Sequence, residues 1–168
     1  MKTHRNIQNF VNRLTNKYTH YFDVYREEKL DDIPLAFLAI HKRRDERYLL
    51  TRKFKIYGTE NQEVVFTAIH EEKLTKNYIE NFINRMETNF NQYLDEHDEH
   101  MSSILYGIII TNNDPDQTIA KKVSKYRRVK FLKFGLHGWV EFYLIIVNPT
   151  SKNVWVHPKG KPLVETIE

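Results

Sequence analysis

The chain of 168 residues is 40% hydrophobic and 29% charged, a composition that predicts one folded domain, residues 1–168, with a sizeable core. It contains no cysteine, which excludes a disulfide framework, a thiol nucleophile and a thiolate metal site. The formal net charge of +4 is compatible with binding to a polyanion. No signal peptide is visible, and no apolar run approaches the roughly 20 residues of a membrane helix, so we expect a cytoplasmic protein without membrane contact.

The N-terminal segment predicts a helix that docks on the core. Its apolar residues recur at steps of three and four, which places them on one face of a helix. They are Ile7, Phe10, Val11, Leu14, Tyr18, Tyr21, Phe22 and Tyr25. Thr3 is the candidate N-cap of this helix, because a threonine side chain can accept a hydrogen bond from a free backbone N–H in the first turn.

Three strands are expected next, at residues 33–42, 47–57 and 63–70. The turns between them are the short charged segment RRDE and the polar segment GTENQ. Because the connections are short, we expect these strands to pair in sequence order as an antiparallel meander.

The second half of the chain alternates helices and strands. Residues 75–97 have helical spacing, and residues 101–111 form a strand that is apolar on both faces. A short helix follows Asn113 or Asp114, either of which is a candidate N-cap. Residues 139–147 predict a second interior strand beside the first, residues 154–157 a last strand, and residues 128–134 an additional short one.

This order of elements predicts an α/β (α+β) fold in a single domain. We expect a mixed, mainly antiparallel sheet of about five to six strands, with two long helices and one short helix on its faces.

Two basic clusters are the candidate binding surface for nucleic acid or another polyanion, since lysine and arginine neutralise phosphates. The first cluster consists of Arg43, Arg44, Arg47, Lys53 and Lys55, and the second of Lys121, Lys122, Lys125, Arg127, Arg128 and Lys130. In the alternative interpretation these charges neutralise the acidic residues between 87 and 99, either within the fold or across a homodimer.

His137 and Glu141 are candidates for a pocket. His137 lies between two glycines, and Glu141 interrupts an otherwise apolar strand. If Glu141 is buried, its charge needs a cationic or hydrogen-bonding partner, which the neighbouring basic run can supply. A weaker alternative is a metal site at His97 and His100, which are three residues apart near the end of a helix.

The order helix, three strands, helix, strand resembles the core of the PD-(D/E)xK, or restriction-endonuclease-like, nucleases. Glu71-Glu72-Lys73 supplies an E-x-K string after the third expected strand, and Asp45 precedes the second. The resemblance implies that Asp45 and Glu71 hold Mg²⁺ and that Lys73 orients a water molecule. The chain departs from the family because it has no Pro-Asp pair and both acids lie in expected turns.

The segments HMSSILYGIIIT, KFLKFGLHGW and NVWVHPKGKPL are similar to those of a family of small single-domain Bacillota and archaeal proteins of unknown function, over nearly the whole chain. That resemblance implies no activity. We therefore expect a non-enzymatic accessory protein without a cofactor, whose basic surface contacts nucleic acid or another polyanion. The alternatives are a divergent Mg²⁺-dependent nuclease and a protein-interaction module or homodimer.

Overall fold

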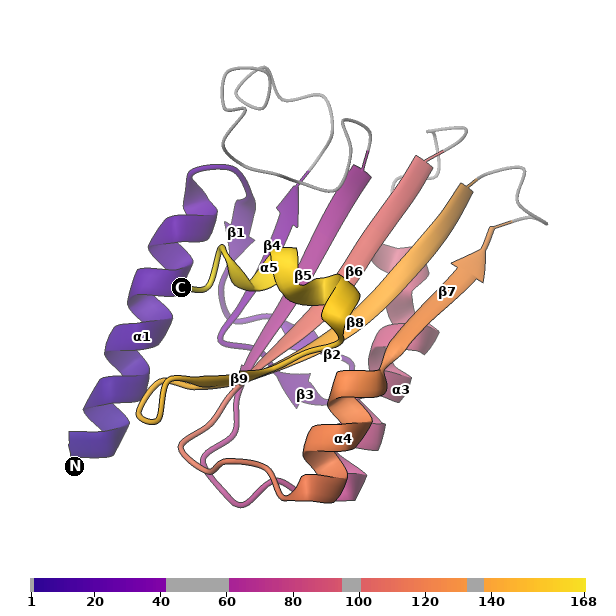
Figure 1. Cartoon of the computed structure of the whole chain (residues 1–168). Helices are drawn as coiled ribbons and strands as arrows, with labels where there is room; N and C mark the ends of the chain where they lie inside the picture. The colour runs from indigo at the N-terminus through magenta and orange to yellow at the C-terminus, as the bar shows by residue number, and fades with distance from the viewer. Residues whose placement is uncertain (1, 42–60, 95–100, 133–137) are drawn as a thin grey trace.

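The computed structural model describes residues 2–41, 61–94, 101–132 and 138–168, which form one sheet with helices on both faces (Figure 1). The sheet contains seven strands in the order β1-β4-β5-β6-β8-β7, and β9 also pairs with β8. They are β1 (Asp23–Tyr25), β4 (Phe37–His41), β5 (Asn61–Ile69), β6 (Met101–Ile110), β7 (Arg127–Phe131), β8 (Gly138–Asn148) and β9 (Asn153–Trp155). A separate hairpin joins β2 (Lys29–Leu30) to β3 (Ile33–Pro34).

The sheet is mixed, as predicted. Its centre is parallel, because β6 lies between β5 and β8 and runs parallel to both. The remaining pairings, β1 with β4, β4 with β5, and β7 and β9 with β8, are antiparallel.

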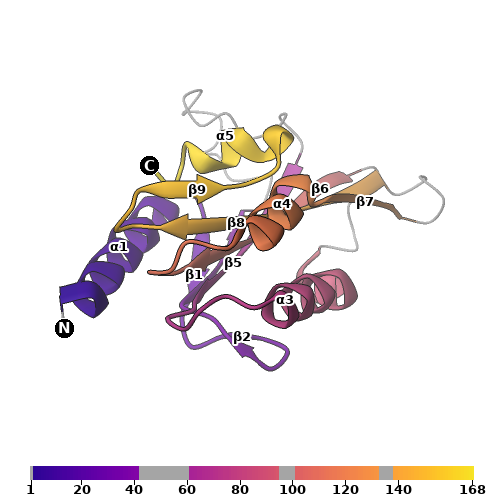
Figure 2. The same cartoon turned by 60° about the horizontal axis from the view of Figure 1, so that its bottom comes forward.

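Two apolar clusters form the core, one on each face of the sheet. One contains buried residues of α3 (Lys76–Asn89) and α4 (Gln117–Lys125). The other contains buried residues of α1 (Lys2–Thr19) and α5 (Lys161–Val164), and it defines what we call the α1 face. Figure 2 shows α5 and α3 on opposite sides of the sheet. In the part of the chain that the structure describes, no helix has the length and apolar composition needed to span a membrane.

The two interior strands agree with the sequence analysis. β6 and β8 are neighbours, and β8 is buried continuously from Phe142 to Asn148. β7 corresponds to the additional short strand predicted at 128–134. Gly107 of β6 allows close packing of α3, since a Cβ atom there would lie 2.3 Å from the Phe82 ring.

Several local predictions were wrong. α1 begins by Lys2, so Thr3 lies inside the helix and does not cap it. The helix ends at Thr19 because the following residues enter β1, whose pairing with β4 replaces the helical spacing predicted through Tyr25. At α4 the cap is Asp116, whose side chain accepts a hydrogen bond from the backbone N–H of Ile119 at 2.9 Å, in place of Asn113 or Asp114.

The predicted meander is also wrong. β4 pairs directly with β5, so no strand lies between the elements at 33–42 and 63–70. Residues 47–57, the middle strand of that prediction, lie outside the described residues. The restriction-endonuclease-like order that depended on the meander is therefore not confirmed. The helix predicted at 75–97 is α3 followed by a 3₁₀ turn, η1 (Phe90–Tyr93).

Candidate functional site

Most cations of the second basic cluster are held by groups of the protein itself. Lys122 Nζ lies 3.0 Å from Glu80 Oε1, and Arg128 Nε lies 2.7 Å from Glu87 Oε1. Lys130 donates a hydrogen bond to the backbone carbonyl of Glu87 at 2.9 Å and lies 5.4 Å from the centre of the Phe90 ring. Such contacts are expected if the basic residues neutralise acidic residues within the fold, which is the alternative interpretation given above.

Two residues of that cluster, Lys121 and Lys125, have no ion pair among the described residues and belong to α4. The first basic cluster, from Arg43 to Lys55, lies outside the described residues. Its convergence with the second cluster therefore stays a prediction.

The exposed side of α1 carries a stronger concentration of unpaired positive charge. The sequence from residue 2 to residue 22 contains no aspartate or glutamate. The helix buries Ile7, Val11, Leu14 and Tyr18 on one side. Its other sides carry four cations, Lys2, Arg5, Arg13 and Lys17, and four asparagines, Asn6, Asn9, Asn12 and Asn16. We call these eight residues the α1 polar stripe.

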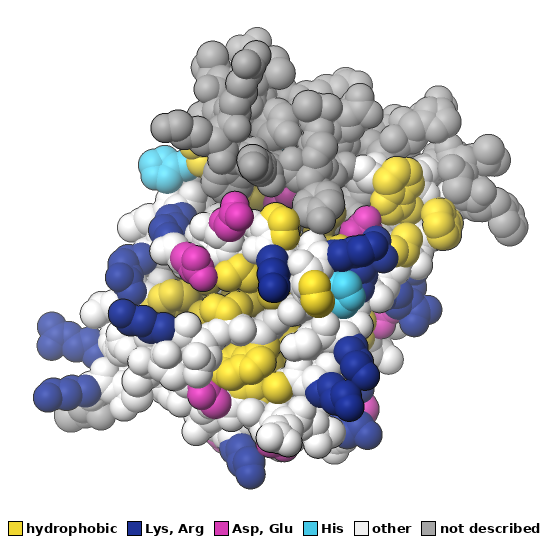
Figure 3. All heavy atoms as spheres, in the orientation of Figure 1, with side chains coloured by type: hydrophobic (Ala, Val, Ile, Leu, Met, Phe, Trp, Pro, Cys, Tyr) yellow, Lys and Arg dark blue, Asp and Glu magenta, His cyan; other side chains and the backbone are white. Residues whose placement is uncertain are grey.

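None of the four cations of the α1 polar stripe forms an ion pair with a described residue, although ion pairs occur elsewhere on the surface. Figure 3 shows lysine and arginine side chains projecting along the left of the molecule, over α1. Sequence reasoning interpreted α1 only as a core helix. The signal that it missed was the absence of acids over the first 22 residues.

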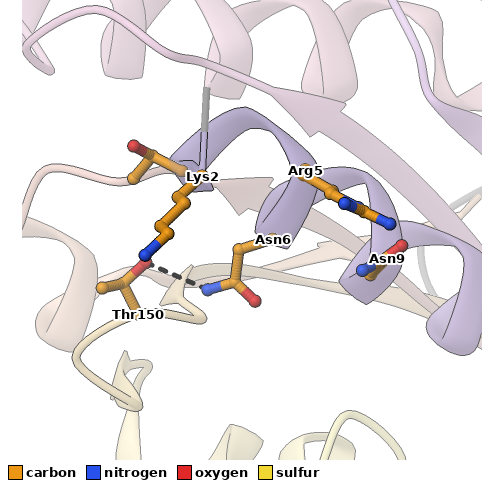
Figure 4. A pocket seen from close by; sticks show the side chains of 6 residues that line it. Lys2, Arg5, Asn6, Asn9 and Thr150 are labelled. Atoms are coloured by element: carbon orange, nitrogen blue, oxygen red, sulfur yellow. Dashed lines mark hydrogen bonds between the residues drawn. The ribbon is translucent and has the colours of Figure 1, made fainter.

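An open hollow of about 440 Å³ lies beside the first two turns of α1 (Figure 4). It is lined by Lys2, Thr3, Arg5, Asn6, Asn9 and Thr150, and thus by two cations and no acid. Asn6 Nδ2 donates a hydrogen bond to Thr150 Oγ1 at 3.2 Å, which joins α1 to the turn between β8 and β9.

The turn that carries Thr150 is fixed by Asp114. The Asp114 carboxylate accepts hydrogen bonds from Asn148 at 2.6 Å, Ser151 at 2.9 Å and Asn153 at 3.1 Å. Desolvation opposes the charged form, but these three donors outweigh it and lower the pKa of Asp114. The carboxylate therefore ties the loop after β6 to both ends of the β8–β9 turn.

Glu141 has the kind of partner that the sequence analysis required. It is 15% exposed, and its Oε1 atom lies 3.3 Å from Nη2 of Arg127. Tyr143 donates to Glu141 Oε2 at 2.7 Å and accepts from Arg127 Nε at 3.1 Å, which closes a three-residue network. Burial and the bond to Glu141 raise the pKa of Tyr143 to about 12. His137, the other candidate for this pocket, lies outside the described residues.

Glu63 of β5 is a fully buried carboxyl, and the sequence did not reveal it. It is 2% exposed, and its Oε1 atom has no hydrogen-bond partner among the described residues. Burial raises the pKa of Glu63 to about 8. Tyr18 and Tyr106 share a buried hydrogen bond of 2.8 Å, and burial together with an ionised Glu63 raises the pKa of both tyrosines. His41 of β4 is the register partner of Glu63.

The described part of the structure contains only two of the three candidate nuclease residues, Glu71 and Lys73. Glu71 follows the end of β5, where it contacts His4 of α1, and Lys73 is exposed two residues later. Asp45, His97 and His100 lie outside the described residues. Within the four described ranges, no group of three histidine, aspartate or glutamate side chains could hold a metal ion.

Comparison with known proteins assigns the chain to a family, but it assigns no activity to the chain. The model of a family described as a domain of unknown function, DUF8052, matches residues 6–168. No curated protein and no solved structure matches the chain.

Proposed function

Because the chain belongs to the DUF8052 family, whose function is unknown, its activity must be inferred from its own side chains, and we propose that it binds the phosphate backbone of a nucleic acid without catalysing a reaction. The observation that carries the proposal is the α1 polar stripe, in which four cations and four asparagines occur without an acid. The stripe, and not the second basic cluster, is the main contact surface in this proposal.

The chemistry of the stripe suits phosphate groups. Arginine, lysine and asparagine side chains are among the usual donors to phosphate oxygens in complexes with nucleic acids. A helix of 18 residues is about 27 Å long, so its cations can contact several successive phosphates. Such contacts supply affinity through the release of counterions and carry no sequence information.

The cations of the α1 polar stripe are free to bind phosphate, whereas most of those in the second basic cluster are already bound to groups of the protein. Lys122 and Arg128 must leave Glu80 and Glu87 before they can neutralise a phosphate. Lys2 and Arg5 have no such competitor among the described residues, and they line an open hollow together with amide and hydroxyl groups. Lys121 and Lys125 are unpaired as well and are expected to add to binding from α4.

Two variants with the same loss of charge test this proposal. One carries Lys2→Gln and Arg5→Gln, and the other carries Lys122→Gln and Arg128→Gln. Binding of a fluorescent oligonucleotide is followed by anisotropy at salt concentrations between about 50 and 200 mM. We expect the first variant to reduce the slope of log K against log salt by about 1.4–1.8, at roughly 0.7–0.9 for each of the two lost phosphate contacts, and the second variant to change the slope little.

Equal effects of the two variants would show that only net charge matters, which contradicts a site on α1. Undetectable binding of the unmodified protein to DNA and RNA at low salt would overturn the proposal. Binding of heparin or polyphosphate with higher affinity than nucleic acid would assign the stripe to another polyanion.

A further inference from the structure

Two exposed aromatic residues occupy opposite positions of one strand pair at an edge of the sheet. Among the described residues, the exposed large hydrophobic side chains are Tyr25, Phe131 and Trp139. Phe131 is 69% exposed and Trp139 is 42% exposed, and the two are register partners in the antiparallel pair of β7 and β8. Directly opposite residues of an antiparallel pair have Cβ atoms about 4.5–5.5 Å apart on one face, so the two side chains leave the sheet side by side, each with its ring free of the other.

The side chains of Phe131 and Trp139 lie on the α1 face of the sheet, the same face as the guanidinium group of Arg127. Successive residues of a strand alternate between faces, which places Phe131 on the face of Arg127, and Trp139 on that of Glu141 and Tyr143. Arg127 is held by Tyr143 and Glu141 and remains 27% exposed. Figure 3 shows hydrophobic side chains at the upper right, over the end of β7, with basic, acidic and histidine side chains beside them.

We propose that Phe131 and Trp139 form a stacking platform for the unpaired bases of a single-stranded nucleic acid. The proposal rests on the function proposed above and narrows its ligand from any nucleic acid to a single strand. Bases of a single strand are free to stack on aromatic rings, and every base offers a π-face, so the contact tolerates any sequence. The planar guanidinium of Arg127, two positions further along the same face of β7 and beyond Val129, offers a second stacking surface.

A second copy of the chain fits this edge less well. β7 is an edge strand, so pairing with β7 of another copy is the obvious competing use of the surface. Antiparallel pairing centred on Val129 would set Arg128 of each copy opposite Lys130 of the other. Like charges directly opposite each other destabilise a strand pair. Pairing of two copies in this register is therefore disfavoured.

The test compares three ligands of one length: an oligonucleotide of unpaired thymidines, the same backbone without bases, and a duplex. Phe131→Ala and Trp139→Ala are each expected to weaken binding of the oligothymidine about 5- to 100-fold, as for the loss of one stacked base. Binding of the abasic strand and the duplex, and the salt slope of all three, should not change. Tyr25→Ala is the matched control, because Tyr25 is 45% exposed on β1, at the opposite edge of the sheet, and should have no effect.

A direct signal comes from Trp139 itself. In a Trp155→Phe background, Trp139 is the remaining tryptophan, and its fluorescence should be quenched by the oligothymidine but not by the abasic strand. Equal binding of the oligothymidine and the abasic strand, with no loss in the alanine variants, would overturn the platform and leave backbone binding by α1 intact. Absence of binding to all three ligands would overturn both proposals. A dimer in solution that Phe131→Ala dissociates would assign the surface to a second copy.

Discussion

Glu63 and Glu141 occupy matching places in the sheet and have different surroundings. Each lies opposite Ile104 of β6, Glu63 from one side on β5 and Glu141 from the other on β8, and both point to the α1 face. Glu141 is bound by Arg127 and Tyr143. Glu63 has no ion pair among the described residues, and one of its oxygens has no hydrogen-bond partner.

The contrast shows how the neighbouring strand affects the charge of a carboxyl on the α1 face. β8 is flanked by β7, which supplies an arginine at the level of Tyr143, so Glu141 keeps a cationic partner. Glu63 lies beside the buried side chain of His41 on β4 and near the paired hydroxyls of Tyr18 and Tyr106, it has no ion pair among the described residues, and desolvation raises its pKa to about 8. At neutral pH Glu141 is therefore held in an ion pair, whereas Glu63 is a neutral carboxylic acid.

The largest expected effect is the pH dependence that Glu63 gives to stability. Its pKa is raised from 4.5 to about 8 in the folded protein, so between these values the folded state holds a proton that the unfolded state has lost. The free energy of unfolding should therefore fall by about 3–5 kcal/mol as pH rises from about 4.5 to 8. Glu63→Gln should abolish this fall, as measured by urea denaturation across that range.

Glu72→Gln, which changes an exposed acid nine residues later, is the control for that experiment and should leave the pH profile unchanged. Identical pH profiles for the wild type and Glu63→Gln would show that Glu63 is charged or paired in solution.

Breaking the network at Glu141 should have a smaller effect. Arg127→Met removes the ion pair and leaves a carboxylate that is only 15% exposed, which should cost about 1–3 kcal/mol at neutral pH. Combining it with Glu141→Gln should cost less than the sum of the single changes, because the second change removes the unpaired charge. Lys122→Met breaks the exposed pair with Glu80 and should cost less than Arg127→Met.

Additive losses in this double-mutant cycle, measured by urea denaturation, would indicate that Arg127 and Glu141 do not interact in solution.

The smallest expected effect concerns the hydroxyl pair near Glu63. Tyr18→Phe leaves the buried hydroxyl of Tyr106 without its partner at 2.8 Å and should cost about 0.5–1.5 kcal/mol. Tyr18→Phe combined with Tyr106→Phe should recover part of this loss, because no polar atom is then left unpaired. A double variant less stable than the sum of the two single variants would contradict this account.

The parts of the fold that sequence could predict are those in which one pattern dominates. β6 and β8 were recognisable because apolar residues occupy both faces of each strand, which is typical of the interior of a parallel sheet. α4 was recognisable from the apolar spacing of Ile119, Val123 and Tyr126, although its cap is Asp116. In both cases local pattern and tertiary packing agree.

Where pairing between distant strands decides the outcome, the sequence was not sufficient. Tyr25 continues the helical spacing of α1, yet its backbone pairs with Leu38 of β4. The direct pairing of β4 with β5 cannot be deduced from short connections alone. The burial of Glu63 depends on the packing of α1 above it, which residue alternation in β5 does not report. The acid-free segment of α1, by contrast, was visible in the sequence and could have been identified there.

The core cluster beneath α1 unites the two ends of the chain, since Ile7 and Val11 belong to the same cluster as Leu163, Val164 and Ile167. During synthesis on the ribosome, α1 is made well before residue 163, and this cluster cannot be completed until Ile167 has been added. At elongation rates of about 5–20 residues per second, that interval lasts roughly 8–30 s. For this time the apolar side of α1 lacks part of its cover.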